Sequence, residues 1–169
     1  MPNILIDGYN VIGTIHKNLE KARRDLVGQL SRYASLKGHN ITVVFDGWKN
    51  GQAEKTKERR GGIDIIYSSL GETADLVIKD MLSASVKAWI VVSSDREIYN
   101  YAKKKSYVAL TRDEFKARLD LAALTASERD SVEPWQDKDS SYETAATKKG
   151  NPRKLSKNDR RKMDAIKKL

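Results

Sequence analysis

The sequence contains no cysteine, only two histidines and three prolines, and no long apolar run. Without cysteine the chain has no disulfide bonds or thiolate metal sites, and this composition suits the reducing cytoplasm, where we place the protein. The chain enters a short apolar stretch directly, without a basic leader, so we expect no signal peptide, membrane span or membrane partner. Its 169 residues are 39% hydrophobic, enough for one core if the polar residues are concentrated elsewhere. The sequence does not indicate an oligomeric state.

The excess of positive charge is concentrated near the C-terminus. Of the net charge of +9, residues from Lys138 onward contribute +7, from eleven basic and four acidic side chains, and residues 1–137 contribute +2. Such a segment favours a polyanionic partner, most often nucleic acid. A tail that serves only solubility would have the same composition. We therefore predict a domain over residues 1–124 and a basic, partly disordered or helical extension over residues 125–169.

Short β-branched runs alternate with helical patterns along residues 1–124. Strands are expected at residues 3–7, 41–46, 63–68, 88–92 and 107–110, and helices at 19–36, 71–85, 96–102 and 112–124. This alternation predicts an α/β fold with a mainly parallel, doubly wound sheet. In the strand at 63–68, Asp64 alternates with isoleucines, so this strand is expected at a sheet edge. Residues 48–62, rich in lysine and arginine, are interpreted as a mobile loop.

Four aspartates lie where predicted strands end or the next helix begins: Asp7, Asp46, Asp75 and Asp95. Ligands of open parallel sheets bind beyond the carboxyl ends of the strands, where the strand order reverses. If the first strand is central, these carboxylates converge on one crevice. Each acid also has a simpler interpretation, because Asp46 suits a turn with Gly47, Asp75 complements a helix dipole and Asp95 suits an N-cap.

Several carboxylates in one crevice require either raised pKa values or a bound cation. Oxygen ligands without histidine or cysteine favour Mg²⁺ or Mn²⁺, which would activate water for attack on a phosphodiester. We assign Asp7 and Asp95 as the main ligands and Asp75 as a ligand that binds directly or through water. Asp46 would complete the ligand shell or position the attacking water. Glu72 either supports that shell or simply opens a helix.

Neutral and basic residues near these acids are candidates for binding the substrate. Asn10 and Ser94 suit the orientation of a phosphate or a water molecule. Trp48 follows the second strand and would either stack on a base or pack at the mouth of the sheet. The basic candidates in the following loop are Lys49, Lys55, Lys57, Arg59 and Arg60.

Other motifs carry less information. The loop at 52–62 lacks the residue order of a P-loop, and no G-x-G-x-x-G follows the first strand, which disfavours a dinucleotide enzyme. His16 and His39 are expected at the surface and Trp89 in the core. Arg96 would contact phosphate or form a surface ion pair. The helical pattern at 71–85 predicts that Leu76, Val77, Met81 and Leu82 point inward.

The motifs IDGYNVIG at residues 6–13, FDG at 45–47, GETAD at 71–75 and SSD at 93–95 together resemble the NYN domain, in particular its bacterial YacP-like branch. The resemblance runs from residue 1 to about residue 124. It implies a PIN-like three-layer α/β/α sandwich and a divalent-metal-dependent ribonuclease. The acidic positions of the family correspond to Asp7, Asp46, Asp75 and Asp95, and its motif asparagine corresponds to Asn10. Free RNA and RNA on a ribosome both remain open as substrates.

Three functions are consistent with parts of this sequence. The first is a metal-dependent endoribonuclease acting on single-stranded RNA, with the basic loop and tail binding the phosphate backbone. The second is a non-catalytic RNA- or ribosome-binding module, which would gain nothing from clustered carboxylates. The third, a small-molecule phosphohydrolase, is disfavoured by the basic tail and by the absence of a second aspartate two residues after Asp7.

Overall fold

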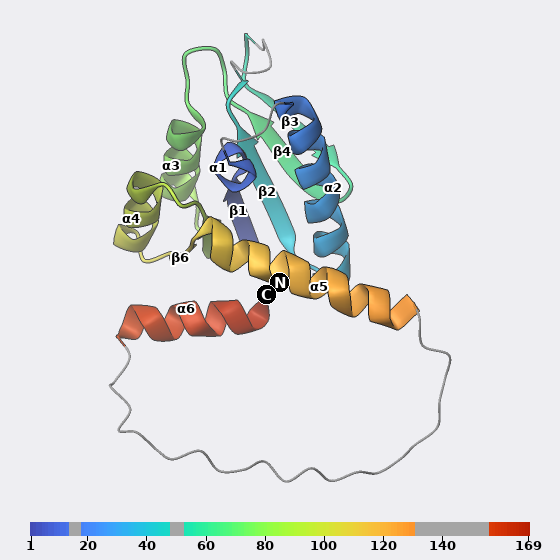
Figure 1. Ribbon diagram of the computed structural model, residues 1–169. Helices are drawn as coiled ribbons and strands as arrows, with labels where there is room; N and C mark the ends of the chain where they lie inside the picture. The colour runs from blue at the N-terminus through green and yellow to red at the C-terminus, as the bar shows by residue number, and fades with distance from the viewer. Residues whose placement is uncertain (14–17, 48–52, 131–155) are drawn as a thin grey trace, which may run out of the picture.

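The computed structural model describes residues 1–13, 18–47, 53–130 and 156–169 as a six-stranded sheet covered by helices on both faces (Figure 1). The strands are β1 (Asn3–Asp7), β2 (Asn40–Phe45), β3 (Thr56–Arg60), β4 (Ile63–Tyr67), β5 (Trp89–Val92) and β6 (Val108–Leu110). The helices are α1 (Gly8–Ile12), α2 (Leu19–Lys37), α3 (Ala74–Ala84), α4 (Arg96–Lys104), α5 (Arg112–Asp130) and α6 (Lys157–Lys168). The predicted mainly parallel α/β fold is confirmed. No helix of these residues has the length and apolar character that a membrane crossing requires.

Strand β1 lies in the middle of the sheet, whose order is β3-β4-β2-β1-β5-β6. It pairs in parallel with β2 on one side, where Asp7 is opposite Val44, and with β5 on the other, where Ile6 is opposite Val92. The strand order therefore reverses at β1, and the chain crosses over opposite faces on its two sides. In such a sheet the ligand crevice is expected beyond the carboxyl ends of β1, β2 and β5.

Each face of the sheet has its own core. Ile4, Ile6 and Phe45 pack with residues of α2 and α5 on one face. Leu5 and Val44 pack with residues of α3 and α4 on the other. Because side chains alternate along a strand, Asp7 follows Leu5 onto the face that α3 and α4 cover. The alternation of side chains along the strand thus directs this carboxylate toward α3, which carries Asp75, and toward α4, which Asp95 caps.

The helix starts are fixed by side-chain caps. Asn18 accepts a hydrogen bond from the Lys21 amide at 2.9 Å at the start of α2. At the start of α5 the Thr111 amide donates to the Glu114 carboxylate at 2.8 Å, and the Glu114 amide donates to Thr111 Oγ1 at 3.3 Å. These two contacts form a capping box, and α5 extends to Asp130 rather than ending near Leu124.

Strand β3 corrects two of the expectations. The part of the segment 48–62 that the structure describes is not a loop throughout, because Thr56–Arg60 pairs antiparallel with β4. Consequently β4 lies inside the sheet and β3 forms the edge. All five residues of β3 are exposed and polar or charged, so no apolar alternation marks them as a strand. Charged side chains are a common protection of edge strands.

Two side chains lie elsewhere than expected. His39 is buried, not at the surface, because Gly38 ends α2 in a left-handed conformation and turns the chain directly into β2. Its ring packs edge-on against Tyr33, and burial lowers its pKa. Leu76 was expected inward but is 50% exposed, whereas Val77 and Leu82 are buried as predicted. His16 lies outside the described residues.

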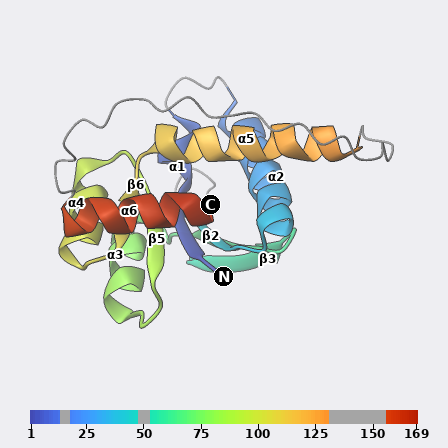
Figure 2. The same ribbon diagram turned by 90° about the horizontal axis from the view of Figure 1, so that it is seen from below.

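The basic segment at the C-terminus ends in a helix that packs on the domain. Helix α6 lies across the end of the sheet at which β1 begins (Figure 2). Ala165 and Leu169 are buried in the core, and the Tyr33 hydroxyl donates to the Leu169 carbonyl at 2.7 Å. Lys162 pairs with Glu114 at 2.7 Å. The described part of this segment is therefore anchored at the end of the sheet opposite the four aspartates.

Candidate active site

Asp7 is the best-buried acid at the carboxyl end of the sheet, with 6% of its surface exposed. Its two oxygens accept hydrogen bonds from the Asn10 amide at 3.2 Å and from Ser93 Oγ at 3.1 Å. Burial raises the pKa of the Asp7 carboxyl to about 6. The two hydrogen bonds lower it, and the charges of Asp75 and Asp46 raise it. Asp7 is thus fixed in place, titrates somewhat below neutral pH, and lies within electrostatic reach of Asp75 and Asp46.

The residue after Asp7 is a glycine because helix α1 packs closely on the end of β2. Gly8 is the first residue of α1, and a Cβ placed there would lie 2.2 Å from the ring of Phe45. Close packing of α1 on the end of β2 therefore requires glycine. This packing keeps Asn10, two residues later, beside Asp7.

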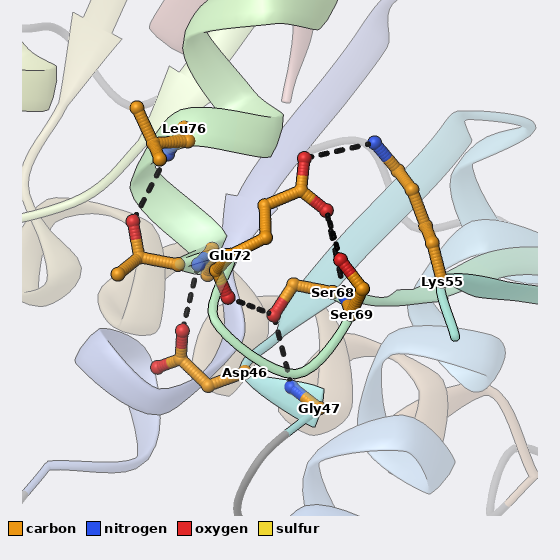
Figure 3. A network of polar contacts seen from close by, with 9 residues as sticks. Asp46, Gly47, Lys55, Ser68, Ser69, Glu72 and Leu76 are labelled. Carbon is orange, nitrogen blue, oxygen red and sulfur yellow. Dashed lines mark hydrogen bonds and ion pairs between the residues drawn. The ribbon is translucent and has the colours of Figure 1, made fainter. Parts of the chain in front are cut away.

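Asp46 ties the end of β2 to the start of α3. Its Oδ1 accepts a hydrogen bond from the Ala74 amide at 2.6 Å. Around it, the Gly47 amide donates to Ser68 Oγ at 3.0 Å, and Ser68 Oγ donates to the Glu72 carbonyl at 2.7 Å (Figure 3). Asp46 therefore does more than form a turn with Gly47: it also stabilises the start of α3, the helix that carries Asp75.

Glu72 has a structural role in this network. Its carboxylate accepts a hydrogen bond from Ser69 Oγ at 3.2 Å and pairs with Lys55 Nζ at 3.5 Å (Figure 3). These contacts hold together the turn before α3 and the segment before β3. The contacts of Glu72 support a structural role at the start of α3 rather than support of a metal-ligand shell.

Asp95 is the N-cap of α4, as its spacing suggested. Its Oδ1 accepts hydrogen bonds from the Glu97 amide at 2.7 Å and the Ile98 amide at 3.3 Å. The Asp95 amide itself donates to Ser93 Oγ, the hydroxyl that binds Asp7. Capping occupies one oxygen of Asp95 and leaves the other without a hydrogen bond from any described residue.

Asp75 differs from the other acids because its carboxylate makes no hydrogen bond with a described residue. Burial raises its pKa, and the charges of Asp95 and Asp46 raise it further. Lys79, one turn later on α3, forms an ion pair with Glu97 of α4, and its charge lowers the pKa of Asp75. The four acids thus influence one another as a cluster, and one lysine partly compensates it.

A chain of hydrogen bonds links the cluster to α5. The Ser94 amide donates to Asn10 Oδ1 at 2.7 Å, and the Arg112 amide donates to Ser94 Oγ at 2.9 Å. The Arg112 side chain is 40% exposed, and its guanidinium lies against Gly13 at the end of α1. Asn10 and Ser94 therefore lie beside the acidic cluster, and their role in orienting a phosphate or a water molecule stays a prediction. Arg112 was missed, because in the sequence it is only the residue after a helix cap.

The basic residues predicted to bind RNA lie at different distances from the acids along β3. Lys55 precedes Thr56, which pairs with Tyr67 at the carboxyl end of β4, and it therefore lies near the acids. Lys57 pairs with Asp64 at 3.1 Å. Arg59 and Arg60, opposite Asp64 and Ile63, lie at the other end of the edge strand. Trp48 and Lys49 are outside the described residues.

The donor chemistry of the cluster fits the divalent ion that the resemblance implies. Carboxylate, amide and hydroxyl oxygens converge there, and the pKa values of two acids are raised in part by like charges. No group of three acidic, histidine or cysteine side chains among the described residues is arranged as a ready metal cage. Mg²⁺ usually keeps several waters and uses one or two carboxylates together with substrate phosphates. Coordination of one ion by Asp7, Asp75 and Asp95 stays a prediction.

Comparison with known proteins identifies relatives of this fold. The family model described as the YacP-like NYN domain matches residues 4–168. A crystal structure of Rae1 (YacP) from Bacillus subtilis is similar at a TM-score of 0.63, with 24% identity over 76% of this chain and 79% of that one. A mutant of the same protein gives a TM-score of 0.63, with 22% identity over 79% of this chain and 86% of that one. No curated protein matches.

Proposed function

This chain belongs to the YacP-like NYN domain family, and on that premise we propose that it is a divalent-metal-dependent endoribonuclease that cleaves single-stranded RNA in the cytoplasm. NYN domains belong to the PIN-like nuclease superfamily. The observation that carries the proposal is the grouping of Asp7, Asp46, Asp75 and Asp95 at the point where the strand order reverses. A module that only binds RNA would be weakened by such a cluster, since it repels phosphate.

The roles of the residues follow from their contacts. Asp7, Asp75 and Asp95 would hold the Mg²⁺ or Mn²⁺ ion, which when bound supplies an activated water and shields the charge of the transition state. Asp46 keeps α3, and with it Asp75, in position through the Ala74 amide. Asn10 and Ser94 bind each other at the mouth of the crevice and orient the phosphodiester. Free RNA and ribosome-bound RNA are both compatible with this arrangement.

The test is cleavage of a labelled single-stranded RNA with Mg²⁺ or Mn²⁺ and with EDTA. Wild type is compared with Asp7→Asn and Asp95→Asn, in which asparagine keeps the size and, at Asp95, the capping ability of the original residue. Asp80→Asn, an exposed position on α3, is the matched control. We expect metal-dependent cleavage by wild type and the control, and RNA binding without cleavage by the other two variants. Equal cleavage by all four proteins would refute the proposal.

A further inference from the structure

A cavity of about 420 Å³ lies between α1, α2 and α5, outside the acidic cluster. Val11, Leu26 and Leu119 supply apolar walls, and Gln29 supplies an amide. Two lysines, Lys21 and Lys116, and one acid, Asp25, complete its polar part. This volume falls in the range of small-molecule sites, and the combination of apolar walls, an amide and cations suits a nucleobase attached to a phosphate.

Helix α1 connects Asp7 to the cavity. Asp7 is the N-cap of this five-residue helix, and Val11 lines the cavity near its other end. Five helical residues span about 7.5 Å. Asp7 faces α3 and α4 whereas the cavity faces α2 and α5, so an RNA strand with a phosphate at Asp7 would cross the end of α1 to bring its neighbouring base to the cavity.

Arg112 lies between these two places. Its amide is bound to Ser94 at the crevice, and its guanidinium packs on Gly13 at the end of α1, where a Cβ would lie 3.1 Å from Nη1. Gly13 has a φ of +83°, so both its backbone conformation and the close approach of Arg112 favour glycine at this position. The ion pair of Arg112 with Asp113 joins exposed side chains at 3.3 Å and competes only weakly with a phosphate. Lys116 follows one turn later on α5 and continues the line of cations into the cavity.

We propose that this cavity is the subsite for the base of the nucleotide that adjoins the scissile phosphate, and that Arg112 and Lys116 bind the phosphate of that nucleotide. The inference rests on the proposed ribonuclease function and adds a substrate contact outside the acidic cluster. It makes single-stranded RNA the preferred substrate, because a paired and stacked base cannot enter a cavity of this kind without leaving its helix.

The first experiment fills the cavity. Ala22, half-buried on α2, lines it, and Ala22→Phe would occupy the space of the base. Ala117→Phe, at an exposed position of α5 outside the cavity lining, is the matched control. The substrates are RNA oligonucleotides with one abasic ribose at successive positions around the mapped cleavage site. Base contacts of 1–3 kcal/mol correspond to about five- to 150-fold in affinity.

For wild type and Ala117→Phe we expect the abasic ribose to raise KM about tenfold at one position next to the cleavage site. For Ala22→Phe we expect a similar rise on intact RNA and no further response to the abasic ribose. If wild type cleaves RNA but responds to no abasic position, or if Ala22→Phe responds as wild type does, the subsite is refuted and the ribonuclease function stands. Absence of metal-dependent cleavage by wild type would overturn both.

A second variant tests the cation without filling space. Arg112→Gln should raise KM for RNA and reduce the slope of log affinity against log salt by about one ionic contact. Arg118→Gln is its control, since Arg118 lies on the same helix near Tyr33, away from the acids. Equal salt slopes for Arg112→Gln and wild type would refute the phosphate contact.

Discussion

Replacing Asp7 by asparagine should make the protein more stable above neutral pH while removing its activity. The carboxyl is 6% exposed, and its pKa is raised from 3.8 to about 6, chiefly by burial. A group whose pKa is higher in the folded than in the unfolded state contributes stability at low pH and loses it as the pH rises through the folded pKa. The loss for Asp7 therefore develops between about pH 4 and pH 6. Asparagine has no charge to bury, so the variant avoids this loss.

A shift of about two pKa units corresponds to about 3 kcal/mol. The unfolding free energy of Asp7→Asn should thus exceed that of wild type by about 1 kcal/mol at pH 4.5 and about 3 kcal/mol at pH 8. Asparagine can retain both contacts, accepting from the Asn10 amide and donating to Ser93 Oγ. The assay is urea unfolding followed by far-ultraviolet circular dichroism, in EDTA, from pH 4.5 to pH 8.

Asp80→Asn serves as the control, because this residue is exposed on α3 and should show no comparable gain. A difference between Asp7→Asn and wild type that does not change with pH would refute the reasoning. So would a variant less stable than wild type at pH 8, since the carboxylate would then stabilise the fold.

Three further predictions concern other parts of the structure. Asp75→Asn should lower kcat/KM for RNA by about 10²- to 10³-fold, because Asp75 is assigned as a metal ligand. The unfolding free energy should not fall, because the Asp75 carboxylate makes no hydrogen bond with a described residue. A loss of kcat/KM below tenfold would contradict the assignment as a ligand. Lys79→Met should move the acid limb of the cleavage–pH profile to higher pH, since the charge of Lys79 lowers the pKa of Asp75. The measurement is kcat/KM between pH 5 and pH 9, and an acid limb at the same pH as in wild type would exclude this coupling. Leu169→Ala should lower the unfolding free energy by about 2 kcal/mol, because Leu169 at the end of α6 is buried in the core. Met163→Ala, at a half-exposed position of α6, should change the unfolding free energy by less than about 0.5 kcal/mol. Equal effects of the two variants in chemical denaturation would show that α6 does not pack as described.

The central strands and the converging acids could be predicted because their signals are local. Strands β1, β2 and β5 are short, apolar runs, and each ends at or just before a polar turn. The positions of Asp7, Asp46 and Asp95 then follow from the geometry of any parallel sheet. The structure adds that capping and metal binding are not exclusive interpretations, because Asp95 caps α4 through one oxygen only.

The features that were missed depend on contacts between distant parts of the chain. Strand β3 has only exposed, charged or polar residues and exists because β4 offers it a partner. His39 is buried by Tyr33 of α2. The packing of α6 under the sheet depends on Leu169 meeting Tyr33, 136 residues earlier. Arg112 reaches the site through Ser94 and Gly13. None of these pairings has a local signal in a sequence.

The proposed function depends most on the sharing of one divalent ion by Asp7 of β1, Asp75 of α3 and Asp95, the N-cap of α4. Anomalous diffraction from crystals grown with Mn²⁺ tests this directly. We expect one manganese peak with Asp7, Asp75 and Asp95 as ligands, directly or through water, and its loss in Asp75→Asn. A peak elsewhere, or no peak at these acids under conditions in which the protein cleaves RNA, would contradict the proposed metal site.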